Sequence, residues 1–298
     1  MPQAPTIHPT AHVGKEADLA PGVVIGPFCV ITGPVTLGAG VRLMGSNYVQ
    51  GPTTIGAGTT LYPHACVGFE PQDVKFKPGD PTAGVVIGAN CILREHATVN
   101  AAGKPDNPTR LGDSVFMLIG SHVGHDAVVG NNVTLINNAA VGGHARVGAN
   151  VLMGGGAAVH QFCRIGRFAM VAGLAGVSQD LPPFCVCNST NRMGGINRIG
   201  LRRNGFSRED ITAITRAYMD ILRTPTHREA MLSELRTRAK TLGCAPLLEM
   251  ADFIQETNRG IMPGMGKPPR DAVAWFKKVQ QIVASNQPPL DADDDDVD

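Results

Sequence analysis

The chain carries an aliphatic residue at nearly every sixth position from Ile7 to Val177. A helix repeats about every 3.6 residues and a strand every two, so neither element alone produces this spacing. The register is lost after Val67, returns at Ile87, Leu93 and Val99, and then runs on from Leu111. The two long blocks contain Ile7, Val13, Leu19, Ile25, Ile31, Leu37, Leu43, Val49, Ile55, Leu61 and Val67, then Leu111, Met117, Val123, Val129, Leu135, Val141, Val147, Met153, Val159, Ile165, Val171 and Val177.

A period of six fits a short strand followed by a corner, and three such hexads close one triangular coil. The aliphatic residue points into the prism, while glycine, with 36 copies in the chain, permits the corners. Successive coils then stack through parallel strand hydrogen bonds about 4.8 Å apart. Each coil contacts only its neighbours, so stability accumulates with repeat number. The spacing therefore predicts a parallel β-solenoid.

Two segments interrupt the repeat. Residues 69–84 and 100–110 are rich in glycine and proline, which favour turns. The second segment keeps the hexads on either side of it in register. We expect both segments to be loops that project from the prism, and long excursions from a rigid scaffold often carry function.

The character of the sequence changes after the repeat. Pro182-Pro183 ends the pattern, and residues 207–210 resemble a helix capping box. Residues 226–229 form a second box, and further helices are expected over 246–258 and 270–285. The expected division is a β-helix over residues 1–190, a C-terminal α-helical domain over 191–285 and a disordered acidic tail over 286–298.

Composition narrows the class of protein. A net charge of +1 excludes a general nucleic-acid binder, which carries a strong basic excess. The seven cysteines have no CxxC spacing, which predicts buried free thiols in a reducing compartment. No stretch approaches the roughly 20 apolar residues of a membrane span, and the N-terminus has no signal-peptide pattern. We therefore expect a cytoplasmic protein without stable membrane insertion.

Histidines gather on successive coils. His125, Gly143 and Gln161 follow one another at intervals of three hexads and are expected to stack in one column, and Asp126 and His144 share the next. His122 and His160 lie on adjoining corners. This cluster fits either of two kinds of site. Three histidines can hold a catalytic zinc ion, or one histidine can act as a general base.

In the general-base interpretation, His125 needs an orienting partner, and Asp126 is adjacent in sequence. Neighbouring residues on a flat strand point to opposite faces. The pair therefore forms only if the corner geometry brings the two side chains together.

Two strings along the histidine-bearing coils are specific. Residues 121–126 read Ser-His-Val-Gly-His-Asp, and residues 158–162 read Ala-Val-His-Gln-Phe. They resemble the H-x-x-H-D signature and the A-V-H-Q-F element of the UDP-N-acetylglucosamine O-acyltransferase family. Gly142-Gly143-His144, residues 72–75 and residues 200–208 resemble further motifs in order, and the similarity spans about residues 6 to 262. The resemblance implies a left-handed β-helix and a homotrimer.

The resemblance also implies a reaction, in which an acyl chain moves from acyl carrier protein to the sugar 3-hydroxyl of UDP-N-acetylglucosamine, the first step of lipid A synthesis. The acyl-phosphopantetheine of the carrier is the co-substrate, and no metal or other cofactor is implied. His125 corresponds to the general base, Asp126 to its orienting group and Gly143 to the oxyanion donor. The corresponding substrate-binding positions are Asp73, Lys75, His122, His144, His160, Gln161, Asn197 and Arg203, with Gly173 at the acyl-chain ruler position.

Alternatives remain open at this point. A related N-acyltransferase that acts on a UDP-3-amino sugar is the nearest, and Asn100 and Asn204 depart from the family pattern. A metal enzyme similar to the γ-class carbonic anhydrases would use the histidine cluster for zinc, and a non-catalytic scaffold would not need it. An acidic carrier protein would be steered by a basic patch. The candidate arginines are Arg164, Arg167, Arg192, Arg198, Arg202 and Arg203.

Overall fold

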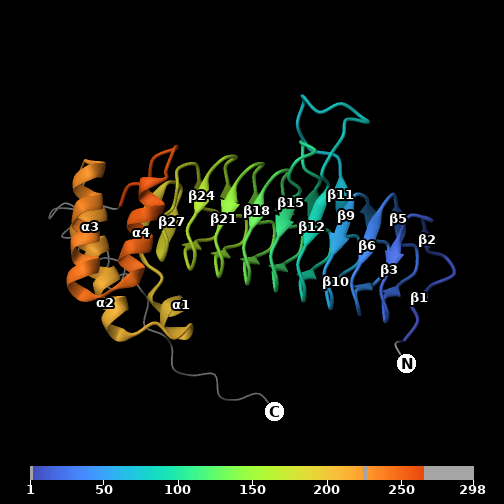
Figure 1. Ribbon diagram of the computed structural model, residues 1–298, viewed down its shortest axis with the longest axis horizontal. Coiled ribbons are helices and arrows are strands. Elements are labelled where there is room, and N and C mark those ends of the chain that lie inside the picture. Colours follow the sequence, from blue (N-terminus) through green and yellow to red (C-terminus); the bar gives the residue numbers. More distant parts are fainter. Residues whose placement is uncertain (1–2, 224–226, 265–298) are drawn as a thin grey trace, which may run out of the picture. The chain divides into compact units, whose positions relative to one another are not determined.

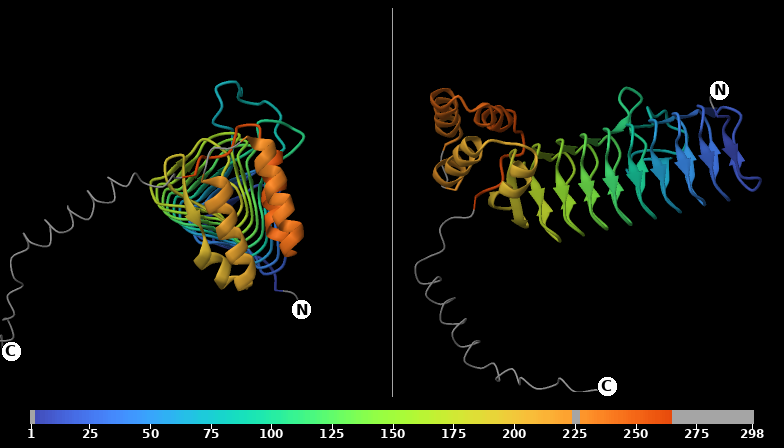
Figure 2. Two further views of the ribbon diagram at one scale, coloured as in Figure 1. Left: turned by 90° about the vertical axis from the view of Figure 1, so that its left-hand side faces the viewer. Right: turned by 90° about the horizontal axis from the view of Figure 1, so that it is seen from below.

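The computed structural model describes residues 3–223 and 227–264, and it forms a parallel β-solenoid followed by helices. The expected helix over 270–285 and the acidic tail lie outside the described residues. Successive coils stack along one axis (Figure 1), and the end-on view in Figure 2 shows their three-sided outline. The parallel β-solenoid expected from the repeat is thus the fold of the protein, and its left-handed form is the one that the family resemblance implies.

The strands form three sheets, named here sheets A, B and C. Sheet A contains β1 (Thr6–Ile7), β4 (Val24–Ile25), β7 (Arg42–Leu43), β10 (Thr60–Leu61), β13 (Ile92–Leu93), β16 (Phe116–Met117), β19 (Thr134–Leu135), β22 (Leu152–Met153), β25 (Met170–Val171), β27 (Cys185–Ser189) and β28 (Arg192–Ile196). Sheet B contains β2 (His12–Val13), β5 (Val30–Thr32), β8 (Tyr48–Gln50), β11 (Cys66–Phe69), β14 (Thr98–Asn100), β17 (His122–Val123), β20 (Ala140–Val141), β23 (Ala158–Val159) and β26 (Gly176–Val177). Sheet C contains β3 (Asp18–Leu19), β6 (Val35–Leu37), β9 (Thr53–Ile55), β12 (Val85–Ile87), β15 (Thr109–Leu111), β18 (Val128–Val129), β21 (Arg146–Val147) and β24 (Arg164–Ile165).

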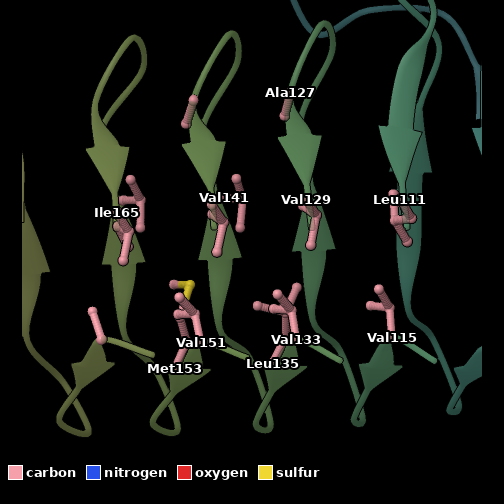
Figure 3. Packing of buried hydrophobic residues seen from close by; sticks show 14 of the residues in the cluster. Leu111, Val115, Ala127, Val129, Val133, Leu135, Val141, Val151, Met153 and Ile165 are labelled. Carbon is pink, nitrogen blue, oxygen red and sulfur yellow. The ribbon is translucent and has the colours of Figure 1, made fainter. Parts of the chain in front are cut away.

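The hexad residues fill the prism as the spacing predicts. Leu135 pairs in register with Met153 on the next coil, and both side chains are fully buried. Figure 3 shows these two residues stacked, with Val133 and Val151 beside them as a second buried row. Ile7 differs and is 44% exposed, because no coil lies beneath the first one to cover it.

The cysteines are free thiols, and most of them are buried. Six of the seven occupy buried positions as free thiols, and Cys66 is half-buried. Burial raises the pKa of these thiols, for example that of Cys244 to about 11. The expectation of free thiols is confirmed. None of the helices in the described residues is long and apolar enough to cross a membrane.

Two excursions leave the prism at the same corner, between sheets B and C. The first connects β11 to β12 and projects beyond the strands (Figure 1), and the second connects β14 to β15. The two are joined by a backbone hydrogen bond from Ala83 N–H to the Lys104 carbonyl, 3.0 Å. Asn100 also holds this corner, because its Nδ2 donates to the carbonyls of Phe69 and Glu70.

Sheet A continues to Ile196, past the expected boundary at 190, because β27 and β28 form an antiparallel hairpin. A short helix, α1 (Arg198–Arg203), follows and was not expected. Ser207 caps α2 (Arg208–Ala217) as the capping box predicts, since its side chain accepts from the Asp210 N–H. The remaining helical elements are a π-helical turn, η1 (Tyr218–Leu222), then α3 (Arg228–Leu242) and α4 (Ala245–Gln255).

Asp180 ties the segment after α4 to the last coil. This carboxylate is 1% exposed and accepts from the Arg164 backbone N–H at 2.8 Å and from the Thr257 hydroxyl at 2.7 Å. The Asp180 backbone N–H donates to the Gly260 carbonyl at 2.9 Å, and the Asp180 carbonyl accepts from the Met262 N–H at 2.8 Å. A buried carboxylate with two donors therefore fastens the chain end against the β-helix.

We expect Asp180→Ala to lower the free energy of unfolding by about 2–3 kcal/mol, because it leaves two buried donors without an acceptor. Thermal and urea unfolding would measure the change. Glu234→Ala is the matched control, since its ion pair with Arg238 is exposed and contributes less than about 1 kcal/mol. Equal stability of the Asp180 variant and the wild type would contradict this role.

Candidate functional site

The corner between sheets B and C brings His125 and Asp126 together. Asp126 has a φ of +59°, a left-handed conformation that turns the chain sharply between β17 and β18. As a result the two consecutive side chains meet, with His125 Nδ1 at 2.7 Å from Asp126 Oδ2. Both side chains are only 11% exposed. The geometry that the general-base interpretation requires is therefore present.

The second excursion fixes the Asp126 carboxylate. Gly103 N–H donates to Oδ2 at 2.9 Å, and the Asp126 backbone N–H donates to Thr109 Oγ1 at 2.8 Å. An ionised carboxylate only accepts, so its bond to His125 places the imidazole proton on Nδ1 and leaves Nε2 with a free lone pair. The sequence carried no signal for Gly103 or Thr109, because loop contacts do not follow the repeat.

Gly143 lies beside His125 on the next coil, where the His144 N–H donates to the His125 carbonyl at 2.9 Å. A β-carbon built on Gly143 would lie 2.7 Å from His125 Nε2, well inside van der Waals contact. The missing side chain therefore leaves a gap against the free imidazole nitrogen. The Gly143 N–H makes no hydrogen bond within the described residues.

His144 packs across the pair. Its ring meets that of His125 edge-to-face at 5.1 Å and stacks on Phe162 at 4.6 Å, and its Nε2 lies 3.7 Å from Asp126 Oδ2. Burial lowers the pKa of His144, and the nearby His125 lowers it further, whereas Asp126 opposes this shift. Phe162 belongs to the Ala-Val-His-Gln-Phe string, but the family resemblance implies no role for it.

His125, Asp126 and His144 also form a set of possible metal ligands, because their donor atoms lie within 4.8 Å of one another. Two histidines and a carboxylate are a ligand set found in catalytic zinc sites. Here the Nδ1 atom of His125 and the Oδ2 atom of Asp126 share a hydrogen bond, so these two atoms already have a partner. The geometry therefore favours the general base.

Several of the predicted substrate-binding residues surround this corner. His122 Nδ1 lies 2.8 Å from Thr98 Oγ1, and burial, followed by the nearby His125, lowers the pKa of His122. His160 and Gln161 are exposed on the adjoining coil. In the first excursion, Asp73 accepts from the Lys75 N–H at 3.0 Å. Asp73 lies close enough to His144 to oppose, weakly, the lowering of the His144 pKa by burial.

Three predicted residues lie elsewhere in the chain. Gly173 is exposed on the corner between sheets A and B, and Arg203 is exposed at the end of α1. The Asn197 side chain caps α1, accepting from the Gly200 N–H at 3.0 Å and donating to the Phe168 carbonyl at 2.9 Å. A single chain therefore does not gather these three around His125.

A groove of about 1550 Å³ runs along sheet C from this corner to α4. Asp126, His144 and Phe162 line one end, and the second excursion forms a wall. The sequence did not predict the groove, because it depends on where α4 docks.

A family model described as Udp N-acetylglucosamine O-acyltransferase, Domain 2, matches residues 180–262. A curated acyl-[acyl-carrier-protein]--UDP-N-acetylglucosamine O-acyltransferase from Thermodesulfovibrio yellowstonii is 38% identical over 86% of this chain and 98% of its own length. The chain belongs to the UDP-N-acetylglucosamine O-acyltransferase family. The corresponding Azorhizobium caulinodans protein is 50% identical over 72% of this chain and 79% of its own length.

Solved structures of the family have the same fold. The Francisella novicida UDP-N-acetylglucosamine acyltransferase superposes with a TM-score of 0.82 at 30% identity, over 90% of this chain and 96% of that one. The Moraxella catarrhalis UDP-N-acetylglucosamine O-acyltransferase superposes with a TM-score of 0.81 at 33% identity, over 86% of this chain and 99% of that one. Family membership makes the carbonic-anhydrase-like and scaffold alternatives unnecessary to explain the histidine cluster.

We expect Gly143→Ala to reduce kcat/KM about 100-fold or more, because the new methyl group would displace the His125 ring or fill the gap beside Nε2. Steady-state kinetics would measure this, and thermal unfolding would show that the fold persists. Gly155→Ala is the control for stability, since its β-carbon would meet nothing closer than 3.5 Å. Wild-type kinetics for the Gly143 variant would show that the gap is not used.

Proposed function

We propose that the chain transfers an acyl group from acyl carrier protein to the 3-hydroxyl of UDP-N-acetylglucosamine, with His125 as the general base. The names of its relatives state the acyl donor and the sugar acceptor, and acyl transfer of this kind begins lipid A synthesis. The observation that carries the mechanism is the His125–Asp126 hydrogen bond at 2.7 Å, which leaves Nε2 facing the gap at Gly143. A base held in one tautomer beside an open space suits removal of a proton from a bound hydroxyl.

The reaction then follows from these positions. His125 Nε2 takes the hydroxyl proton as the sugar oxygen attacks the thioester carbonyl, and negative charge gathers on the carbonyl oxygen. The Gly143 N–H is free to donate to that oxygen, and a donor of this kind contributes about 3–4 kcal/mol. Collapse of the intermediate breaks the carbon–sulfur bond. The phosphopantetheine thiolate leaves and receives the proton back from His125, while Asp126 stabilises the transient imidazolium.

The remaining predicted residues complete the proposal. His122, His144, His160 and Gln161 bind the sugar nucleotide with Asp73 and Lys75 from the first excursion. The depressed pKa values of His122 and His144 keep these imidazoles neutral near pH 7, so they act as hydrogen-bonding groups rather than cations. A neighbouring copy contributes the three remaining residues. Its Asn197 and Arg203 contact the nucleotide, and its Gly173 contacts the acyl chain.

We further propose a homotrimer in which sheet A of each copy packs on sheet B of the next. Several outward residues of sheet A are large and apolar, such as Ile92, Phe116 and Leu152, whereas sheet B includes the small Ala140 and Ala158. Large side chains against a shallow face suit close packing between copies. A closed ring of three uses two faces of each prism. The His125 corner, which borders sheet B, would then lie at the rim of the interface.

The proposed reaction uses no metal or other cofactor, because acid–base chemistry and the Gly143 N–H supply its steps. Its test is a metal assay on active protein. One zinc per active site, with activity lost on chelation and restored by zinc, would overturn it in favour of a metal mechanism at His125 and His144.

We expect His125→Ala to lower kcat by about 10³-fold and Asp126→Asn by about 10²-fold, because the first removes the base and the second loses its orienting carboxylate. Transfer from acyl carrier protein thioesters would be followed with UDP-N-acetylglucosamine and with its 3-amino analogue. His8 is exposed near the N-terminus, far from His125 in the sequence. The control variant His8→Ala should therefore leave kcat unchanged. Transfer to the amino sugar alone would identify the chain as an N-acyltransferase. Full activity without His125 would refute the base assignment.

Light scattering should give a trimer mass for the wild type and a monomer mass for Ala158→Arg, because a charged side chain on sheet B cannot pack against the apolar face. Thr36→Arg places the same charge on an exposed position of sheet C and should remain trimeric. A wild-type monomer that is fully active would contradict the proposed assembly.

A further inference from the structure

The floor of the groove on sheet C is a column in which three of four residues are arginine. The outward positions of four successive strands are Arg110, Val128, Arg146 and Arg164, each paired in register with the next. Arg110 and Arg146 are exposed, and two strand steps separate them by about 10 Å. Both side chains line the same groove as Asp126 and His144.

The fold itself uses two arginines that the sequence suggested for partner binding. Arg164 pairs with Glu256 at 3.1 Å and stacks over the Phe253 ring. Arg167 pairs with Glu249 at 2.5 Å. These contacts hold α4 against the last coils, so the charges of Arg164 and Arg167 are already neutralised. Docking of an acidic partner must therefore depend on other residues.

Unpaired charge in the groove is positive. Arg110 and Arg146 make no ion pair within the part of the chain that the structure describes, and Lys104 and Arg259 at the rim make none either. Most carboxylates lining the groove are paired with arginine or histidine, which leaves Asp106 as the exception among the described residues. The paired carboxylates are Asp126, Glu249, Asp252 and Glu256.

Within the described residues, Arg146 has no role in holding the fold together, which indicates a use outside the fold. It lies directly opposite Arg164 on the adjacent strand, but Glu256 already pairs with Arg164. Nothing in the described chain relieves the charge of Arg146. Apolar side chains are exposed beside it, with Val128 38% exposed and Leu248 46%. Basic residues around exposed apolar side chains are typical of a surface that binds an acidic protein.

We propose that Arg110 and Arg146 form the docking site for the acidic carrier protein that delivers the acyl thioester. This inference rests on the proposed function, because it assigns a surface to that reaction's carrier. A carrier seated over Arg110 and Arg146 lies on the same groove that Asp126 and His144 line. The thioester on its phosphopantetheine arm can therefore reach the gap beside His125 while the protein stays outside.

The spacing of the charges selects an extended partner rather than the sugar nucleotide. A diphosphate is shorter than the two strand steps between the backbones of Arg110 and Arg146, so it reaches both residues only when the two side chains converge on it. A row of carboxylates along a carrier helix spans such a distance, because residues one to two turns apart lie about 5–11 Å from one another. The groove floor thus matches the longer, multiply charged ligand.

The test is the double variant Arg110→Glu/Arg146→Glu. Its KM for acyl carrier protein thioester should rise at least on the order of tenfold with kcat nearly unchanged, because charge complementarity governs encounter more than chemistry. Transfer from a free acyl-phosphopantetheine, which lacks the protein, should match the wild type, as should the KM for UDP-N-acetylglucosamine. The charge-retaining Arg110→Lys/Arg146→Lys variant should recover most of the loss.

Lys15→Glu/Lys240→Glu makes the same change in net charge at exposed positions away from the groove and should leave every constant unchanged. Two failures are distinguishable. A wild type that transfers no acyl group from the carrier would refute the proposed function. A wild type that does so, together with a charge-reversed variant whose KM for the carrier is unchanged, would refute the docking site alone. A raised KM for the sugar nucleotide instead would also refute it.

Discussion

The constant step of three hexads between hydrogen-bonded coils is the constraint on which the rest of the structure depends. It places each aliphatic hexad residue directly above the previous one, as Leu135 and Met153 show, and so builds a continuous core from identical parts. The same step aligns outward positions, which is why His125 and Gly143 meet although they are remote in sequence. One periodic hydrogen-bonding pattern thus determines both the stability of the prism and the alignment of its surface chemistry.

Everything periodic in this protein could be predicted from sequence. The solenoid, the buried hexads and the stacking of His125 with Gly143 follow from counting, and only the first coil deviates, since Ile7 has no neighbour on one side. The close contact between His125 and Asp126 did not follow, because it depends on a backbone conformation at the corner that alternation along a strand does not encode.

Contacts between non-periodic parts lay beyond the sequence for a different reason. Gly103 in the second excursion and Thr109 at the start of β15 hold Asp126, and Arg164 pairs with Glu256, which follows α4 far along the chain. Such pairings are set by tertiary docking, for which the hexad spacing carries no information. The charge pattern identified Arg164 and Arg167 as basic surface, whereas their partners in and beside α4 make them part of the fold.

The register between coils also limits how this chain can change in length. Three hexads complete a coil, so the insertion or loss of a single hexad between His125 and Gly143 would rotate all later side chains onto the adjacent face and separate the two residues. Loss of a whole coil would preserve the faces but bring a different residue opposite His125. Length variation is therefore tolerable chiefly at corners where the chain leaves the prism, as at the two excursions. Insertions and deletions in this enzyme thus act like those in a coding sequence, where only changes that preserve the reading frame leave everything downstream in place.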